Sequence, residues 1–300
     1  MEITKLEPRI VHLTPRSGVD VRRTIPHRKI RMIGAWCFLD HYGPTPQVDA
    51  MSVAAHPHTG LQTVSWLYSG EIEHCDSLGS LQRIRPGELN IMTSGHGIAH
   101  SERSIHDSGD LHGVQLWVAL PEADRGRAPM FHHHKDLPRF EMDGGQARLI
   151  VGRFGDHDSG VTTFSKLVAI ELRLEAGQDY RFALDPEFEY GFHLASGQVR
   201  VEGETLAPGE LMFSPVGRNS ISVTSHSESI ALLLGGVPFQ EKIMMWWNFV
   251  GRTQAEIEQM REDWNAESNR FPAFVDSIGG RIPAPALPNV ALKARTNQIT

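Results

Sequence analysis

Pro86-Gly87-Glu88-Leu89 recurs later in the chain as Pro208-Gly209-Glu210-Leu211. A second pair of tetrapeptides repeats in the same order, because Ser69-Gly70-Glu71-Ile72 is echoed by Ser196-Gly197-Gln198-Val199. The two offsets are 122 and 127 residues. Two repeats in one order at nearly one offset indicate two consecutive copies of a single structural unit.

Apolar and polar residues alternate with a period of two in both copies. Val114 and Leu116 follow this pattern in the first copy, and Val168 and Ile170 follow it in the second. Dipeptides that favour turns, most of them ending in glycine, separate the alternating segments. Many short half-buried strands at such spacing predict an all-β fold with two tandem barrels or sandwiches.

The chain is expected to divide into three regions. Residues 1–140 hold the first copy, residues 155–250 hold the second, and residues 251–300 form a helix and a tail. The charged stretch from Arg139 to Gly155 is the expected linker. Thr253 and Glu256 form a capping-box pattern, which predicts a helix over 253–268. We expect Met244-Met245-Trp246-Trp247 to seal this helix onto the second barrel, and the proline-rich segment after Ile278 to lie extended on the surface.

Composition excludes several classes of protein. The 300 residues are 40% hydrophobic and 22% charged, which is typical of a globular chain. Two cysteines provide neither a disulfide framework nor a cysteine-based zinc site. A net charge of −7 argues against direct binding to nucleic acid, but not against a protein partner. No apolar run approaches the ~20 residues that span a bilayer, so we expect a cytoplasmic protein with no membrane contact.

The main chemical motif is His56-Pro57-His58, followed by His100-Ser101-Glu102. Residues i and i+2 of a strand point to the same face, so each pair projects together. If the two strands face each other inside a barrel, three imidazoles and one carboxylate converge. This donor set suits Fe(II), Mn, Ni, Cu or Zn and leaves coordination positions open for water or substrate.

The other histidines are expected to have lesser roles. We expect His74, His96, His106 and His112 to support the ligands or lie on the surface, and His132-His133-His134 to form a solvated loop. The repeat offset carries His56 and His58 to Leu184 and Asp185, and His100 to Ser222. The second copy therefore lacks the ligands, and metal chemistry is expected in the first copy alone.

Several stretches together resemble the pirin family of the cupin superfamily. They include His56 to Val64, Glu73 to Gly79, and Met92 to Glu102. Flanking segments agree, among them Phe38 to Pro44 and Met245 to Gly251. The resemblance covers about residues 5 to 265 and implies two tandem cupin barrels of the jelly-roll type with a short C-terminal helix.

The resemblance also implies a single mononuclear metal, usually iron, in the N-terminal cupin. The matching ligand positions are His56, His58, His100 and Glu102, the same four that the spacing selects. Two positions depart from the pattern. Gln62 stands where cupins usually carry a carboxylate, and Ala119 stands where an asparagine is common and could line the pocket.

Two functions from different classes follow. The first is a quercetin 2,3-dioxygenase, in which the metal, O2 and a flavonol-like aromatic substrate meet and Glu102 acts as both ligand and base. The second is a redox-sensing iron protein that binds partner proteins of transcription or metabolism without turnover. A metal that only stabilises the barrel is a third interpretation. The dioxygenase ranks first because the ligand set leaves open coordination positions. Because the second copy lacks the ligands, we expect a monomer to be sufficient for function.

Overall fold

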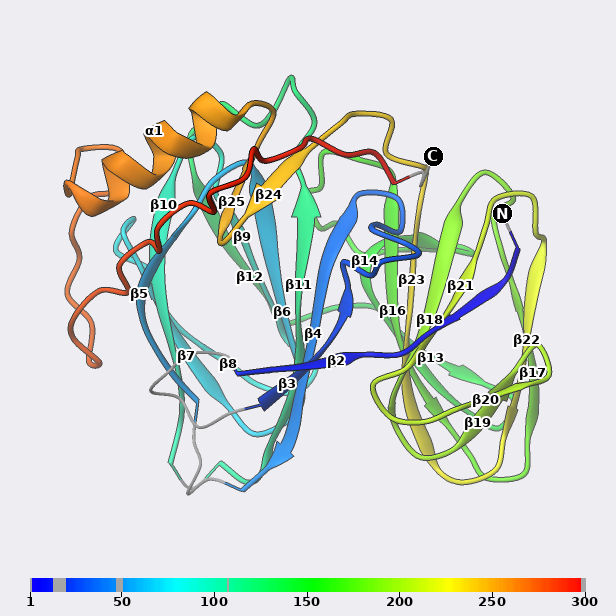
Figure 1. The fold of residues 1–300 in the computed structure, drawn as a ribbon. Helices are drawn as coiled ribbons and strands as arrows, with labels where there is room; N and C mark the ends of the chain where they lie inside the picture. The colour runs from blue at the N-terminus through cyan, green and yellow to red at the C-terminus, as the bar shows by residue number, and fades with distance from the viewer. Residues whose placement is uncertain (1, 13–19, 47–50, 107, 298–300) are drawn as a thin grey trace.

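The computed structural model describes residues 2–12, 20–46, 51–106 and 108–297. In it the chain forms two β-barrels that lie side by side, with one helix above the first barrel (Figure 1). Each barrel consists of one large and one small antiparallel sheet. This arrangement confirms the predicted all-β fold with two tandem barrels.

The large sheet of the first barrel has the order β12-β9-β6-β11-β4-β3-β2, and its small sheet has the order β5-β10-β7-β8. The strands are β2 Arg9–His12, β3 Asp20–Ile25, β4 Trp36–Thr45, β5 Ser52–His58, β6 Leu61–Ser69, β7 Ile72–Asp76, β8 Leu81–Ile84, β9 Leu89–Thr93, β10 Ile98–Ser104, β11 Leu111–Ala119 and β12 Met130–His134.

The second barrel repeats this order strand for strand. Its large sheet runs β1-β21-β18-β23-β16-β14-β13, with β15 paired to β14, and its small sheet runs β17-β22-β19-β20. The strands are β1 Thr4–Leu6, β13 Arg139–Met142, β14 Gly145–Phe154, β15 His157–Asp158, β16 Leu167–Leu174, β17 Asp179–Ala183, β18 Glu189–Ser196, β19 Val199–Val201, β20 Glu204–Leu206, β21 Leu211–Ser214, β22 Ser220–Ser225 and β23 Ser229–Gly236. A further hairpin joins β24 Met244–Trp246 to β25 Phe249–Gly251.

The repeated tetrapeptides occupy matching places in the two barrels. Pro86-Gly87 precedes β9 and Pro208-Gly209 precedes β21, and each glycine has a φ near +90° that favours glycine in a tight turn. The repeat therefore marks equivalent strands, as the sequence predicts.

The first strand of the chain belongs to the second barrel. Thr4–Leu6 pairs with β21, with Lys5 opposite Met212. It takes the edge position that β12 takes in the first barrel. The second barrel thus combines the N-terminal strand β1 with residues 139–236, and the first barrel begins only at β2.

Two predictions about connecting segments were wrong. The expected linker from Arg139 to Gly155 forms β13 and β14, which are part of the large sheet of the second barrel. Its apolar residues Ala147, Leu149, Ile150 and Val151 are buried, while Arg148 between them is half-buried. The run His132-His133-His134 is not a loop but the end of β12, where His133 bonds Asn90 at 2.7 Å.

The two barrels differ in what fills them. The second barrel encloses an apolar core that includes Tyr180, Phe182, Phe192, Ile221 and Val223. The first barrel instead encloses buried polar side chains on β5, β7 and β10. A shared apolar core joins the barrels, and Trp36 donates its indole N–H to the Gly235 carbonyl across the interface at 3.1 Å.

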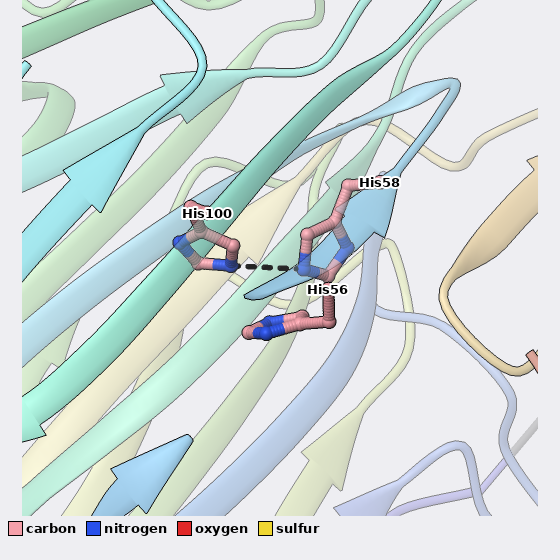
Figure 2. A group of neighbouring side chains, drawn as sticks. All are labelled: His56, His58 and His100. Atoms are coloured by element: carbon pink, nitrogen blue, oxygen red, sulfur yellow. Dashed lines mark hydrogen bonds between the residues drawn. The ribbon is translucent and has the colours of Figure 1, made fainter. Parts of the chain in front are cut away.

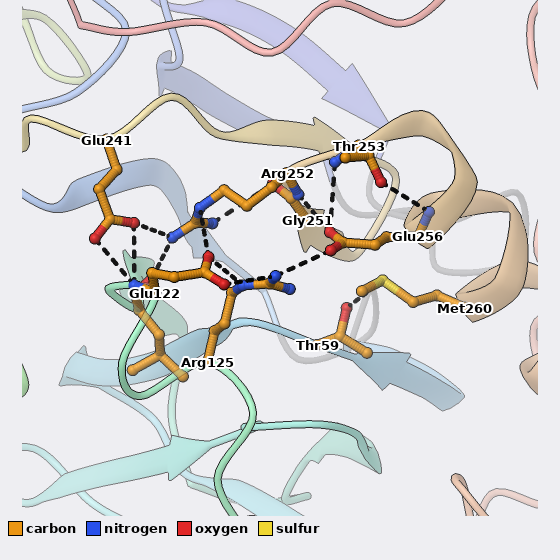
Figure 3. A network of polar contacts seen from close by, with 10 residues as sticks. Thr59, Glu122, Arg125, Glu241, Gly251, Arg252, Thr253, Glu256 and Met260 are labelled. Atoms are coloured by element: carbon orange, nitrogen blue, oxygen red, sulfur yellow. Dashed lines mark hydrogen bonds and ion pairs between the residues drawn. The ribbon is translucent and has the colours of Figure 1, made fainter.

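Helix α1 spans Gln254–Asn265 and is the only helix in the described ranges. The predicted capping box is present, because Thr253 and Glu256 exchange side-chain to backbone hydrogen bonds (Figure 3). Glu256 also pairs with Arg125 of the first barrel at 2.9 Å. No helix in these ranges is long and apolar enough to span a bilayer.

The helix packs on the first barrel, not on the second as predicted. Ile257, Met260 and Trp264 share an apolar cluster with Ala55 and Ala99, which belong to β5 and β10. Met244, Trp246 and Trp247 are part of the same cluster. The expected tail runs over this region and is held by bridges from Arg281 to Ala55 and from Arg295 to Ile243.

Candidate metal centre

Three histidines converge inside the first barrel (Figure 2). The antiparallel pairing of β5 and β10 places His100 directly opposite His56, and His58 follows on the same face of β5. The ring centroid of His100 lies 4.3 Å from that of His56 and 5.0 Å from that of His58. One nitrogen from each ring lies within 4.8 Å of the other two, which is compact enough to hold one metal ion.

Glu102 lies at the edge of this group. A bulge between His100 and Glu102 shifts the register, so Glu102 stands opposite Val53 on β5 and opposite His74 on β7. Its carboxylate groups with His74 and His100 within 4.8 Å. The structure thus unites the three predicted imidazole ligands, and it groups the predicted carboxylate ligand with His74 and His100.

Burial sets the protonation of these groups. All four side chains are less than one-tenth exposed. Burial lowers the pKa of His56 to about 4 and holds the pKa values of His58 and His100 well below the usual value. Burial also raises the pKa of Glu102 above its usual value. Three neutral imidazoles therefore present lone pairs at neutral pH, which is the form that binds a metal.

Hydrogen bonds fix the orientation of the rings. The Nδ1 atom of His56 lies 2.9 Å from the Ala54 carbonyl, which leaves Nε2 for a ligand. The Nδ1 atoms of His100 and His74 lie 3.2 Å apart, and Nε2 of His74 lies 3.0 Å from Asp76 Oδ2. Such outer partners hold ligand imidazoles in one tautomer and one orientation.

Asp76 is in turn held by the backbone. Its Oδ1 accepts the N–H groups of Leu78 and Ser80 at 2.9 and 3.1 Å. Burial acts to raise the pKa of Asp76, but the hydrogen bonds from His74 and Ser80 hold it below the usual value. The chain Asp76, His74, His100 is therefore anchored at its outer end by a carboxylate that stays charged.

The residues present fit a bound divalent cation. Among the residues that the structure describes, the Nε2 atoms of His58 and His100 have only each other as hydrogen-bond partners, at 3.1 Å, and a single hydrogen lies between them when both rings are neutral. Within the same residues, Glu102 accepts a hydrogen bond only from the Ser65 hydroxyl, at 3.3 Å. Nitrogen and carboxylate donors in this number suit Fe, Mn, Ni, Cu or Zn.

A cavity of about 290 Å³ opens beside the histidines. Its wall includes Phe38 and Trp117, whose rings stack at 3.9 Å, and Trp117 also meets His58 edge-on at 5.2 Å. In its lining Arg23 makes a two-pronged ion pair with Asp40, each contact at 2.7 Å. Trp247 and Asn248, which follow β24, also line the cavity.

Several lining residues have no distinctive sequence signal. Gln115 lies 2.8 Å from Ser65, and Ser65 is the partner of Glu102. Only the alternation of β6 and β11 indicates that these two residues face inward. The sequence predicts a supporting role or a surface position for His74, but nothing in it predicts that Asp76 anchors His74 against His100.

The two positions that depart from the family pattern, Gln62 and Ala119, do not line the cavity. Gln62 donates to Thr93 at 2.9 Å and to the Thr162 carbonyl, and it is not part of the cavity lining. Ala119 is fully buried in the core that joins the barrels and does not line the cavity. The expectation that the residue at position 119 lines the pocket is therefore wrong, because Ala119 does not contact the cavity.

The remaining histidines divide into three kinds. His74 supports a ligand and His96 and His106 are exposed, as predicted. His112 was wrongly expected to support the ligands or lie on the surface. It is buried between the barrels, with Nε2 2.8 Å from Nε2 of His41. In the second barrel no comparable group of metal donors is found among the described residues.

Comparison with known proteins agrees with this architecture. Residues 18–118 match the family described as Pirin, and residues 169–271 match the Pirin C-terminal cupin domain. The chain is 42% identical over 273 residues to a Pseudomonas aeruginosa protein named "Putative quercetin 2,3-dioxygenase", covering 90% of this chain and 87% of the relative. It is 37% identical over 278 residues to a pirin-like protein of Caulobacter vibrioides, covering 89% and 94%.

Solved structures show the same likeness. A crystal structure of quercetin 2,3-dioxygenase from Acinetobacter baumannii superposes with a TM-score of 0.93 at 39% identity, covering 98% of both chains. A second quercetin 2,3-dioxygenase structure from that organism gives a TM-score of 0.80 at 26% identity, covering 89% of this chain and 98% of the other.

Proposed function

Because this chain belongs to the pirin family of two-cupin proteins, we propose that it is a metal-dependent dioxygenase of the quercetin 2,3-dioxygenase type. It cleaves a ring of a flavonol-like aromatic substrate and places both atoms of O2 in the product. The observation that carries the proposal is the group of three neutral, buried imidazoles and one buried carboxylate beside an aromatic-walled cavity.

His56, His58, His100 and Glu102 are the proposed ligands of one divalent metal. Fe(II) is the first choice, and Mn, Ni, Cu and Zn suit the same donors. When bound, such a metal supplies Lewis acidity and a route for electrons between an aromatic substrate and O2. His74 and Asp76 hold the His100 ring in the orientation that binding requires.

Glu102 is the proposed base. Burial raises its pKa, which improves its match to the acidity of a phenolic hydroxyl. The bulge on β10 shifts the register at Glu102, and Glu102 lines the cavity, where it can reach a substrate. The Ser65 hydroxyl at 3.3 Å steadies the carboxylate when it is charged.

The cavity wall gives the substrate class. Phe38 and Trp117 stack on each other, and Arg23 lies over the Phe38 ring at 4.4 Å, so the wall combines aromatic carbon with a cation. A planar polyhydroxylated ring system would pack against this aromatic wall and place its hydroxyl groups near Glu102. The apolar wall also excludes water from the reacting atoms.

The first test measures metal content and O2 uptake on protein purified without oxygen, with quercetin as substrate. We expect about one metal per chain and uptake that depends on quercetin. His56→Ala should lose both the metal and the uptake, while the matched variant His96→Ala, which changes an exposed histidine, should keep both.

Two other outcomes would overturn the proposal. One metal per chain without uptake on any flavonol would favour a redox-sensing iron protein that binds partners. Absence of metal from the wild-type protein would mean that the histidine group serves the fold alone.

A further inference from the structure

A second cavity, of about 300 Å³, lies between the two barrels. The first barrel contributes the turn Pro86-Gly87, and the second contributes residues of β13, β14 and β16. None of its lining residues belongs to the cavity beside the histidines. Nothing in the proposed reaction uses this interdomain cavity.

The cavity concentrates positive charge. Arg139 on β13 stands directly opposite Arg148 on β14, and Arg173 on β16 stands opposite Gln146 of the same sheet. All four residues line the cavity. Like charges directly opposite each other on neighbouring strands are destabilising, so this arrangement calls for a compensating anion.

The single carboxylate in the lining is already engaged. Glu171 receives Arg173 at 2.6 Å and the indole N–H of Trp66, from the first barrel, at 2.7 Å. Its side chain is only 6% exposed. Both oxygens of Glu171 therefore already accept hydrogen bonds, from Arg173 and from Trp66, although Glu171 also stands directly opposite Arg148 on the neighbouring strand.

Arg139 and Arg148 lack a charged partner. Arg139 donates to the neutral side chain of Gln146. The side chain of Arg148 has no hydrogen-bond or ion-pair partner among the residues that the structure describes. Its guanidinium lies against Gly87, where a Cβ would overlap it, so the turn of the first barrel lies directly against this guanidinium. Neither guanidinium therefore forms an ion pair with a carboxylate of the described residues, in a chain whose net charge is −7.

We propose that this interdomain cavity binds a small dianion, either a phosphate monoester or a dicarboxylate. Planar guanidinium groups match phosphate and carboxylate oxygens with paired hydrogen bonds. Two unpaired arginines supply the charge, and Gln146 supplies an uncharged amide beside them. Cavities of this size hold small ligands. The bound anion would link the turn Pro86-Gly87 to the sheet of the second barrel.

The test is calorimetric titration of the metal-loaded full-length protein with inorganic phosphate and, separately, with succinate at constant ionic strength. The variants are Arg139→Gln, Arg148→Gln and the double change. Arg153→Gln is the matched control, because Arg153 lies on the same β14 but is 81% exposed and pairs with Asp158. Phosphate that binds at the metal would bind equally to the wild type and to every variant. The interdomain cavity is therefore tested by the difference in affinity between the wild type and the arginine variants.

We expect each single change to weaken binding of at least one of the two anions about ten- to a hundred-fold, and the double change to abolish it. A preference between phosphate and succinate identifies which class the site takes. The anion should also raise the melting temperature of the wild type but not of the double variant. Equal affinity in the wild type and the double variant, or failure of both anions to bind the wild type, would overturn the proposal.

Discussion

At the scale of single residues, the candidate centre depends on how each donor is isolated from water. His56, His58 and His100 owe their neutrality to burial, and Glu102 owes its raised pKa to the same cause. The spacing of the two motifs predicted all four residues, because strand geometry alone decides which side chains share a face. The bulge at His100 could not be predicted, since it depends on the pairing of β10 with two neighbours at once.

Replacing Glu102 by Gln tests the proposed base. The three imidazoles remain, so most of the metal should be retained. Turnover of quercetin should fall by about a hundred-fold or more, as expected when a general base is removed. Metal analysis and O2 uptake on the same sample measure the two effects.

Glu73→Gln is the control for that change. Glu73 lies on β7 of the same small sheet but pairs with Arg103 at 2.7 Å and does not line the cavity. Turnover that is unchanged in Glu102→Gln would show that Glu102 is not the base.

At the scale of elements, helix α1 stabilises the wall behind the histidines. The Thr59 hydroxyl, next in sequence to His58, contacts the sulfur of Met260 at 3.0 Å (Figure 3). The capping box predicted where this helix begins, but its partner barrel could not be predicted. Its apolar face of Ile257, Met260 and Trp264 could pack on either barrel. The path that the chain takes after β23 determines that this face packs on the first barrel.

Glu256→Ala should destabilise the fold at this point. The change removes half of the capping box and the ion pair with Arg125, and we expect a loss of about 1–2 kcal/mol in the free energy of unfolding. Urea titration measures it. Glu262→Ala on the exposed face of the same helix should have little effect, and equal losses in the two variants would contradict the role given to the cap.

At the scale of the whole molecule, the interface between the barrels holds a second group of histidines. His41 and His112 come from the first barrel and His193 comes from β18 of the second, with ring centroids of His41 and His193 5.0 Å apart. Neither ring nitrogen of His193 has a hydrogen-bond partner within the described part of the chain. The sequence repeat predicted two barrels. It could not predict which face of each barrel forms the interface, because alternation within one strand carries no information about contacts between barrels. The histidine group at this interface was therefore not predicted.

This group should make stability depend on pH. Burial lowers the pKa of His193 to about 3 and that of His112 to about 4, below the ~6.5 of an unfolded chain. The unfolded state therefore binds more protons, and the stabilisation present above pH ~6.5 is lost as pH falls toward these values. His193 alone should cost about 2 kcal/mol between pH 7 and pH 5.

His193→Leu should remove that share of the pH dependence. Urea titrations at pH 7 and pH 5 measure the difference for the wild type, for His193→Leu and for His226→Gln, which changes an exposed histidine. We expect a smaller difference in His193→Leu alone. The same difference in all three proteins would contradict the assignment.

The strand β1 has a consequence for how the chain folds as it is synthesised. Lys5 leaves the ribosome more than two hundred residues before its partner Met212. At roughly 5–20 residues per second, that interval is on the order of ten seconds or more. The first barrel can close during this time, but the second cannot gain its outer strand until translation has passed β21. Strand β1 therefore stays unpaired during synthesis until β21 has been translated and the large sheet of the second barrel can form.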